Sequence, residues 1–410
     1  MRTSVTMKSI LLIAPYPPPY GGVSSHTLDL IQSFNQVNQH CDILHFDDHV
    51  EKKMLSNHST LFRVRNIPSF SLLVLFLQNF HKLIKFFYSV SFIRDIRLFF
   101  GSMSRALIIQ KHLKDNSYSD VIIYTSKLGF LIPFLASTNK DIDIHYSFYA
   151  DFSKNPSFYS QHRSWFKNIF DLVKTSFSSS KYCANLPSYL SKSIQPYVVY
   201  VGVDTERFRP VHADIKLDLR AKLSLDAKQT AIFVARFESE MGIESVLSMF
   251  EAIFNARSDL NLIICGASGS ASSLIKDFES KHPQLVRVFE NFESSILPEL
   301  YQTSDILIAP TVGKHACMGV SVKEAMSSGL ISFVSNSGGL PEAIRHCVDG
   351  FIIDLDDEGM VDENTFIASI LRYLDSEDSF ISYRDNARKR AIELFSSQAT
   401  LKKYQDLLEL

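Results

Sequence analysis

The feature that most constrains the fold is an alternation of short, apolar, β-branched runs with segments of helix length, which occurs in both halves of the chain. The runs lie at residues 8–14, 41–46, 120–125 and 141–146 in the first half, and at 230–235, 260–265, 286–290, 305–310, 330–335 and 350–354 in the second. Strands that alternate with helices build parallel sheets from βαβ units. We therefore expect an α/β protein with two doubly wound, Rossmann-like domains that face each other across a cleft. Ligands of such sheets bind at the carboxyl ends of the strands.

The length of 410 residues also fits two domains. We place an N-terminal domain at residues 1–203 and a C-terminal domain at residues 204–394, and we expect a last helix, at about 395–410, to pack back on the first domain. The five cysteines are scattered and never have the spacing of metal ligands, which favours a reducing cytoplasm. The polar first residues lead us to expect no signal peptide.

The two halves of the chain differ in charge. Residues 1–204 have a net charge of +8, and residues 205–410 have a net charge of −10. Such an uneven distribution indicates that one face meets an anionic partner. The basic residues do not form a tract interleaved with stacking aromatic residues, so we expect no nucleic acid as a partner.

Residues 66–114 are rich in Phe, Leu and Ile and are punctuated by Lys and Arg. The uncharged stretch from Asn66 to Phe80 is shorter than the ~20 residues of a membrane-spanning helix. Further on, apolar residues recur at helical spacing beside basic residues, a pattern typical of helices that lie in a lipid interface. We expect this segment to bind an anionic membrane surface and to hold a cytoplasmic protein at the inner face of the membrane. The alternative is a helix pair that covers the first sheet.

A glycine pair follows the first expected strand in "APYPPPYGGVSSH", where Gly21 and Gly22 precede a helix expected at about 23–37. Glycines before a helix let backbone N–H groups approach a phosphate at the positive end of the helix dipole. The alternative is that the turn needs glycine only for its dihedral angles. The motif is not the three-glycine fingerprint of dinucleotide-binding proteins.

Arg236 ends an expected strand in "FVARFESEMG". An arginine at the carboxyl end of a strand suits a diphosphate, because its planar guanidinium binds two oxygens at once. The alternative is an ion pair with Glu238 or Glu240 at the rim of the sheet.

A second candidate binding segment is "CMGVSVKEAM", in which Gly319, Val320 and Ser321 begin an expected helix. The unpaired N–H groups of a helix start attract phosphate. Glu324 follows one turn later, where a carboxylate could accept hydrogen bonds from the two vicinal hydroxyls of a ribose. The alternative is an acidic residue that is stabilised by the helix dipole alone.

These signals occur together, in order, along nearly the whole chain. The segments are "PPYGGVSSHTLDL", "DIDIHYSF", "VGVDTERFRP", "FVARFESEMGIESVL", "SDILIAP", "GVSVKEAMSSG", "SNSGGLPEAI" and "DGFIID". With them the chain resembles the family 4 retaining glycosyltransferases, and the more specific motifs lie in its C-terminal half. The resemblance implies the GT-B fold, a UDP- or GDP-linked sugar as donor, and no cofactor.

The resemblance also implies roles for single residues at a nucleotide-sugar site in the second domain. Arg236 would hold the donor diphosphate together with the amides of Gly319, Val320 and Ser321. Glu324 would bind the ribose hydroxyls.

Further roles implied by the resemblance concern the first domain and a nearby loop. His145 would contact the donor sugar from the first domain, and Gly22 would lie near the reacting centre. Gly338 and Gly339 would shape a loop beside the donor.

The sequence departs from the family pattern at two positions. Met241 stands where the family has a lysine that shares the diphosphate with the arginine, and Ala316 stands where it has a glutamate that contacts donor hydroxyls. The loss of a cation weakens stabilisation of the leaving group. Lys314 or His315, in a loop that is longer than usual, could compensate.

We expect no metal site. Asp141 and Asp143 form an Asp-x-Asp pair of the kind that binds metal in other glycosyltransferases, but the pair lies within an expected strand.

The function that these observations predict is a retaining, metal-independent hexosyltransferase. It would move a sugar from a UDP- or GDP-sugar to a glycan acceptor, expected to be lipid-linked, in the synthesis of a bacterial surface polysaccharide such as lipopolysaccharide O-antigen, capsule or exopolysaccharide. One alternative is a catalytically weak or inactive GT-B partner subunit, which the changes at Met241 and Ala316 favour. Another is a sugar-nucleotide epimerase of the same architecture.

Overall fold

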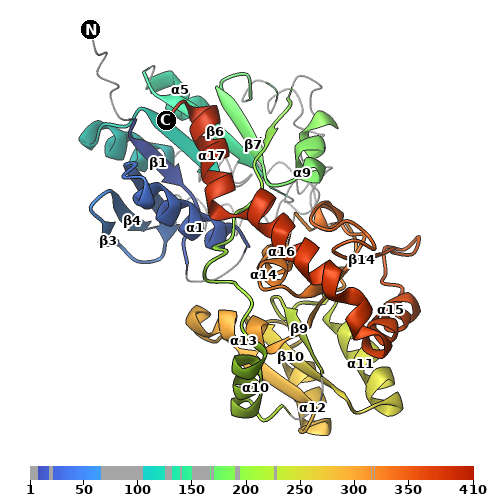
Figure 1. Cartoon of the computed structure of the whole chain (residues 1–410). Helices are drawn as coiled ribbons and strands as arrows, with labels where there is room; N and C mark the ends of the chain where they lie inside the picture. The colour runs from blue at the N-terminus through green and yellow to red at the C-terminus, as the bar shows by residue number, and fades with distance from the viewer. Residues whose placement is uncertain are drawn as a thin grey trace, which may run out of the picture.

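Two sheets organise the protein, as the computed structural model in Figure 1 shows. The structure describes residues 8–17, 22–65, 105–124, 132–138, 141–149, 167, 170–189, 194–225, 229–314, 316–317 and 319–410. Within these residues the first sheet has eight strands in the order β3-β4-β2-β1-β5-β6-β7-β8, and the second has six in the order β11-β10-β9-β12-β13-β14. The expectation of two doubly wound α/β sheets is confirmed. The membrane-binding helix expected within 66–114 falls mostly on residues 66–104, outside the described part of the chain.

The first sheet contains all four strands expected in this half of the chain. Its strands are β1 (Ile10–Ile13), β2 (Cys41–Asp47), β3 (Glu51–Ser56), β4 (Ser59–Arg65), β5 (Asp120–Tyr124), β6 (Asp143–Phe148), β7 (Thr175–Ser178) and β8 (Tyr197–Val198). Every neighbouring pair is parallel except β3 and β4, which form an antiparallel hairpin at the sheet edge. The sequence analysis missed β3 because four of its six side chains are exposed and polar or charged residues predominate. It also missed β4, β7 and β8.

The second sheet is entirely parallel and contains the six expected strands. They are β9 (Gln229–Val234), β10 (Leu260–Gly266), β11 (Val286–Glu290), β12 (Ile306–Ala309), β13 (Ile331–Ser335) and β14 (Gly350–Ile353). Buried strands of a parallel sheet are covered by helices on both faces, so their side chains are apolar in both directions. Strand β12 is an example, since all four of its residues are apolar and three are buried.

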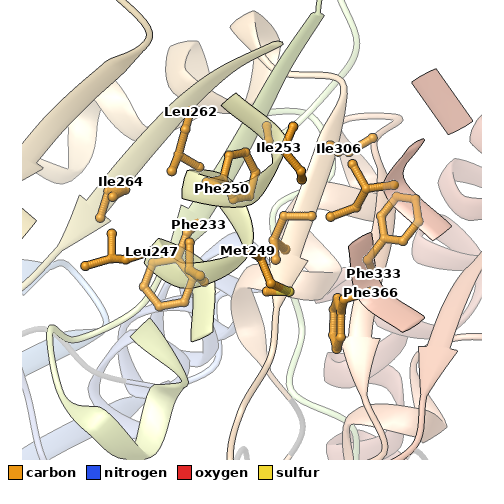
Figure 2. Packing of buried hydrophobic residues seen from close by; sticks show 14 of the residues in the cluster. Phe233, Leu247, Met249, Phe250, Ile253, Leu262, Ile264, Ile306, Phe333 and Phe366 are labelled. Atoms are coloured by element: carbon orange, nitrogen blue, oxygen red, sulfur yellow. The ribbon is translucent and has the colours of Figure 1, made fainter. Parts of the chain in front are cut away.

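Helices cover these sheets and supply the cores. They are α1 (Gly22–Gln36), α5 (Ile132–Thr138), α9 (Lys181–Asn185), α10 (Ala213–Lys222), α11 (Ile243–Ala256), α12 (Ser272–Lys281), α13 (Leu297–Thr303), α14 (Val320–Ser327), α15 (Glu363–Asp375), α16 (Ile381–Phe395) and α17 (Ser397–Leu408). In α11 the apolar residues fall on one face, which packs against the strands of the second sheet (Figure 2). Phe250 of α11 and Phe233 of β9 belong to this buried cluster.

The last two helices connect the domains. Helix α16 lies along the second domain and α17 along the first (Figure 1). The Ser396 side chain caps α17 by accepting a hydrogen bond from the Ala399 amide. Leu401, Tyr404 and Leu408 of α17 then join the core formed by β1, β2 and α1. The chain after residue 396 therefore contributes to the first domain, although the domain boundary at 203 and 204 stays a prediction.

Candidate active site

A cavity of about 890 Å³ lies between the two domains, close to the ends of several strands. It is of the size of small-molecule sites in proteins, which are commonly 300–1,000 Å³. The first domain contributes residues of α1 together with Tyr149, after β6, and Ser179, after β7. The second domain contributes residues that follow β9, β10 and β12 and the start of α14.

The start of α14 points into this cavity. Gly319 precedes the helix in a non-helical conformation, without a side-chain cap on the first turn. Gly319, Val320 and Ser321 all line the cavity. Because the first N–H groups of a helix have no partner within it, this end of α14 is suited to an anion.

Glu324 lies one turn into α14 and lines the same cavity. The Tyr301 hydroxyl donates a hydrogen bond to Glu324 Oε2 at 2.9 Å and lies 3.2 Å from the Ser321 carbonyl oxygen. Burial raises the pKa of Glu324 to about 7, and the Tyr301 hydroxyl acts in the opposite direction. The carboxyl group is therefore oriented by a buried tyrosine and is poised between its neutral and ionised forms.

Asp29 brings a second carboxyl group to the cavity, from α1 of the first domain. Burial raises its pKa to about 7, and the negative charge of Glu324 adds to this effect. The Arg207 side chain also lines the cavity and acts on both acids, lowering the pKa of each. The sequence analysis did not single out Asp29 or Arg207. Asp29 lies two helical turns after Gly22, so it shares a helix face with the glycine that the motif did identify.

Arg236 lies at the rim of the cavity, just after β9. Its guanidinium donates to Glu240 Oε1 at 2.8 Å, so the ion pair considered as an alternative does form. Both side chains line the cavity, and the Arg236 side chain is 48% exposed. Exposed pairs of this kind contribute only about 0–1 kcal/mol, so a ligand phosphate can displace the Glu240 carboxylate.

His145 is not among the residues that line the cavity, and its expected contact with the donor sugar stays a prediction. Its side chain is 1% exposed, its Nε2 is 2.9 Å from Asp120 Oδ1, and its ring stacks on Phe177. The reason is its place in the sheet: His145 is the third of six residues in β6, whereas the carboxyl end of that strand leads to Tyr149, which does line the cavity.

The loop before α14 depends on the glycine pair 338–339. The Gly339 amide donates to the Ala316 carbonyl at 2.9 Å, and a Cβ at Gly339 would lie 1.5 Å from the Cys317 carbonyl oxygen. Gly338 has a φ of +52° and faces the Ala316 carbonyl in the same way. Ala316 and Cys317 line the cavity, so the glycine pair shapes its wall without lining it.

The other residues that were singled out from the sequence do not all lie at the cavity. Gly22 and Met241 line the cavity, whereas Lys314 is exposed and does not. Gly21 and His315 lie outside the described residues. Within the described ranges no group of three His, Cys, Asp or Glu side chains is placed to hold a metal ion.

A contact between the domains supports the same wall of the cavity. The Glu342 carboxylate of the second domain accepts hydrogen bonds from the Lys181 amide at 2.8 Å and the Tyr182 amide at 2.7 Å, at the start of α9. The Tyr182 hydroxyl donates to the Lys314 carbonyl. The first domain thus holds the loop before α14 in place.

Comparison with known proteins agrees with this geometry. Residues 215–393 match the family model "Glycosyl transferases group 1". The chain is similar to this family over those residues. It is 26% identical over 162 residues to a GDP-mannose-dependent alpha-(1-6)-phosphatidylinositol monomannoside mannosyltransferase of Mycobacterium tuberculosis, covering 37% of this chain and 41% of the relative. It is 25% identical over 181 residues to spore coat protein SA of Bacillus subtilis, covering 42% and 47% of the two chains.

A longer match, at 21% identity over 271 residues, is to an uncharacterized 41.2 kDa protein in the cps region of Klebsiella pneumoniae; it covers 63% of this chain and 71% of that protein. The chain spans about half the length, or less, of several curated relatives.

Solved structures show the same fold over the whole chain. Sucrose-phosphate synthase from Thermosynechococcus elongatus has a TM-score of 0.77 at 17% identity, with 98% of each chain covered. Anabaena Alr3699/HepE in complex with UDP has a TM-score of 0.71 at 14% identity, with 98% of this chain and all of that one covered. The GT-B fold expected from the sequence is confirmed. No helix in the described ranges is long and apolar enough to cross a membrane.

Proposed function

We propose that the group 1 glycosyltransferase described here transfers a hexose, with retention of configuration, from a UDP- or GDP-sugar to a glycan acceptor. The observation that supports this most is the meeting of three features in one cavity between the domains. These are the start of α14, the guanidinium of Arg236 and the carboxyl group of Glu324. Together they match the diphosphate and the ribose of a nucleotide-sugar.

The diphosphate would lie between Arg236 and the amides of Gly319, Val320 and Ser321. The helix dipole and the guanidinium both favour negative charge there. Binding requires Arg236 to exchange the Glu240 carboxylate for phosphate oxygens, which form charge-assisted hydrogen bonds in the same geometry. The leaving nucleotide diphosphate gains charge in the transition state, so the same groups would stabilise it.

The ribose would be held by Glu324. Its two oxygens can accept hydrogen bonds from the two vicinal hydroxyls, and Tyr301 fixes the orientation of the carboxylate. The leaving phosphate helps to accept the proton of the acceptor hydroxyl, so no dedicated base is needed. The task of the protein is then to position both substrates and to stabilise charge.

The acceptor is proposed to be lipid-linked, in the assembly of a surface polysaccharide at the inner face of the membrane. The net charge of +8 on residues 1–204 supports an anionic surface as a partner of the first domain. The names of two relatives point the same way, one acting on a phosphatidylinositol mannoside and one encoded in a cps region.

The proposal is tested by measuring nucleotide release from a panel of UDP- and GDP-sugars, with detergent-solubilised lipid acceptors. Release should depend on one donor and should fall at least about 100-fold in Glu324→Gln and Arg236→Ala, because each change removes a charged contact worth about 3 kcal/mol. Glu393→Gln and Arg372→Ala, which change residues that do not line the cavity, are matched controls and should retain activity.

A partner-subunit function remains the second candidate, because Met241 and Ala316 line the cavity where the family resemblance implies a lysine and a glutamate. The same experiment separates the two. A protein that releases no nucleotide from any donor, and whose melting temperature no donor raises, would be a partner subunit and not a transferase.

A further inference from the structure

Two cysteines from different domains meet beside the cavity. Cys183 lies in α9 of the first domain and is fully buried. Cys317 lies in the loop before α14, lines the cavity and is partly exposed. Both are reduced, and their thiols are hydrogen-bonded to each other.

The packing of the domains brings these thiols together. Ser180 caps α9, and its Oγ accepts a hydrogen bond from the Cys183 amide at 3.1 Å. A Cβ at Gly339 would lie 2.9 Å from this Oγ and 1.5 Å from the Cys317 carbonyl oxygen. Gly339 therefore lies next to the residue that caps the helix of Cys183 and next to the backbone of Cys317. Cys317 also packs against the apolar core of the first domain. The approach of the two cysteines is therefore part of the interface between the domains.

The two thiols differ in their access and surroundings. Cys317 lines the cavity, and the buried Lys323 side chain interacts with it electrostatically. Burial lowers the pKa of Lys323 to about 7, so this side chain is charged in about half of the molecules near neutral pH. A nearby cation favours the thiolate, which is the form that reacts with oxidants. Cys183 is shielded from solvent, and its hydrogen bond to Cys317 and its burial raise its pKa. An oxidant would therefore meet Cys317 first, with Cys183 in place as the resolving thiol.

We propose that Cys317 and Cys183 form a peroxide-sensitive site whose disulfide links the two domains and blocks exchange of the donor. In the first step, Cys317 sulfur attacks a hydroperoxide; an S–O bond forms, the O–O bond breaks and, with hydrogen peroxide, one water leaves. In the second step, Cys183 sulfur attacks Cys317 sulfur; the S–S bond forms, the S–O bond breaks and a second water leaves. Both sulfurs are oxidised and one peroxide is reduced to two waters.

The consequence follows from where the bond lies. It would join α9 of the first domain to the loop that forms one wall of the cavity. Two-domain transferases close over their substrates and open to release products, so a covalent link at the cleft prevents that motion. A dithiol reductant would restore it by thiol–disulfide exchange. This effect on turnover rests on the proposed function, whereas formation of the bond does not.

The experiment treats the full chain with a graded series of hydrogen peroxide, alkylates the remaining thiols, digests without reduction and maps linked peptides by mass spectrometry. The expected result is a peptide pair that contains Cys183 and Cys317 and that disappears on treatment with dithiothreitol. Cys347→Ser, which removes the exposed cysteine, is the matched control and should keep the linkage. In Cys183→Ser, Cys317 should stop at the sulfenic acid and be trapped by dimedone.

Oxidation of Cys317 or Cys347 in the wild-type chain without the linked pair would overturn the proposal, and this result needs no variant to fold. Nucleotide release measured on the same samples should fall with the linked fraction and recover with reductant. Full turnover in linked protein would refute the block on exchange. Absence of turnover in the reduced protein would instead count against the transferase function, while the peptide map would still decide the linkage.

Discussion

Tyr301→Phe tests whether Glu324 is held ready for a ribose. The substitution keeps a buried ring that meets Phe208 edge to face and removes only the hydroxyl that donates to Glu324 Oε2 at 2.9 Å. A hydrogen bond to a charged group contributes about 1.5–3 kcal/mol. The lower end applies here, because Glu324 lines a cavity that water can enter. About 1.5 kcal/mol corresponds to about one pKa unit, and to roughly a tenfold loss of nucleotide affinity.

The direction of the pH dependence follows from the pKa. Burial raises the pKa of Glu324 to about 7, and the Tyr301 hydroxyl counteracts this. Hydroxyls of a ribose donate to the ionised carboxylate, so nucleotide binding should strengthen as the pH rises through about 7. In Tyr301→Phe the carboxylate loses its donor, and the midpoint should move to higher pH by about one pH unit.

Isothermal titration calorimetry with UDP and GDP, from mildly acidic to mildly alkaline pH, measures both the affinity and the midpoint. Tyr373→Phe is a matched control, because Tyr373 is also a buried tyrosine of the second domain but does not line the cavity. The reasoning is refuted if Tyr301→Phe and Tyr373→Phe bind nucleotide with the same affinity and the same midpoint as the wild type.

Three further predictions concern the cavity walls. Asp29→Asn should gain stability relative to the wild type, by at most about 4 kcal/mol, as the pH rises from about 4 to 7. The reason is that burial raises the Asp29 pKa from 3.8 to about 7, so the folded state disfavours the ionised carboxyl group. Urea unfolding of both proteins measures this, and a difference in unfolding free energy that stays constant over this pH range would show that the acid is solvated. Gly339→Ala should lose about 2 kcal/mol or more of stability and most nucleotide binding, because the added Cβ would collide with the Cys317 carbonyl oxygen. Gly22→Ala is the control: there is room for a Cβ at Gly22, so this variant should unfold at the same urea concentration as the wild type. Glu342→Gln should weaken the contact with α9 by about 1 kcal/mol and raise KM for the donor. The circular dichroism spectrum should stay that of the wild type, which shows that the fold is kept. An unchanged KM would show that the contact does not position the cavity wall.

The strands predicted from the sequence are those whose own residues are apolar enough to indicate a strand. All ten apolar runs form strands, and most of these strands are buried within a parallel sheet, where both faces are covered. The missed strands depend on their neighbours instead. Strand β3 is mostly exposed and is held at the sheet edge by its hairpin with β4, and β8 is two residues long and pairs with β7 at the other end of the described sheet. A pattern of hydrophobic residues contains no signal for such strands.

In the candidate site, too, some residues follow from motifs and others depend on the arrangement of neighbouring elements. Gly22, Arg236 and Glu324 follow from motifs, and the structure places all three at one cavity, where their roles stay predictions. The donor contact of His145 stays a prediction: the residue lies midway along β6 and does not line the cavity, and the motif did not indicate how far along this strand the cavity begins. Asp29 was missed because a polar residue on an amphipathic helix is ordinarily solvated, and only the arrangement of the second domain turns that face of α1 toward a cavity.

The charge balance of the cavity explains how an anionic donor could bind where the family lysine is replaced by Met241. Among the described residues the charged side chains that line the cavity are Arg207, Arg236, Asp29, Glu240 and Glu324. With every acid ionised this set has a net charge of −1, which opposes a nucleotide diphosphate. Burial raises the pKa of both Asp29 and Glu324 to about 7, and the negative charge of Glu324 raises that of Asp29 further. A ribose that holds Glu324 in its ionised form therefore favours the protonated form of Asp29. The set is then close to neutral, and the dipole of α14 makes anion binding favourable. Donor binding should therefore be accompanied by proton exchange with the buffer, which calorimetry in buffers of different ionisation enthalpy measures directly; binding without proton exchange would show that these acids keep their charge state.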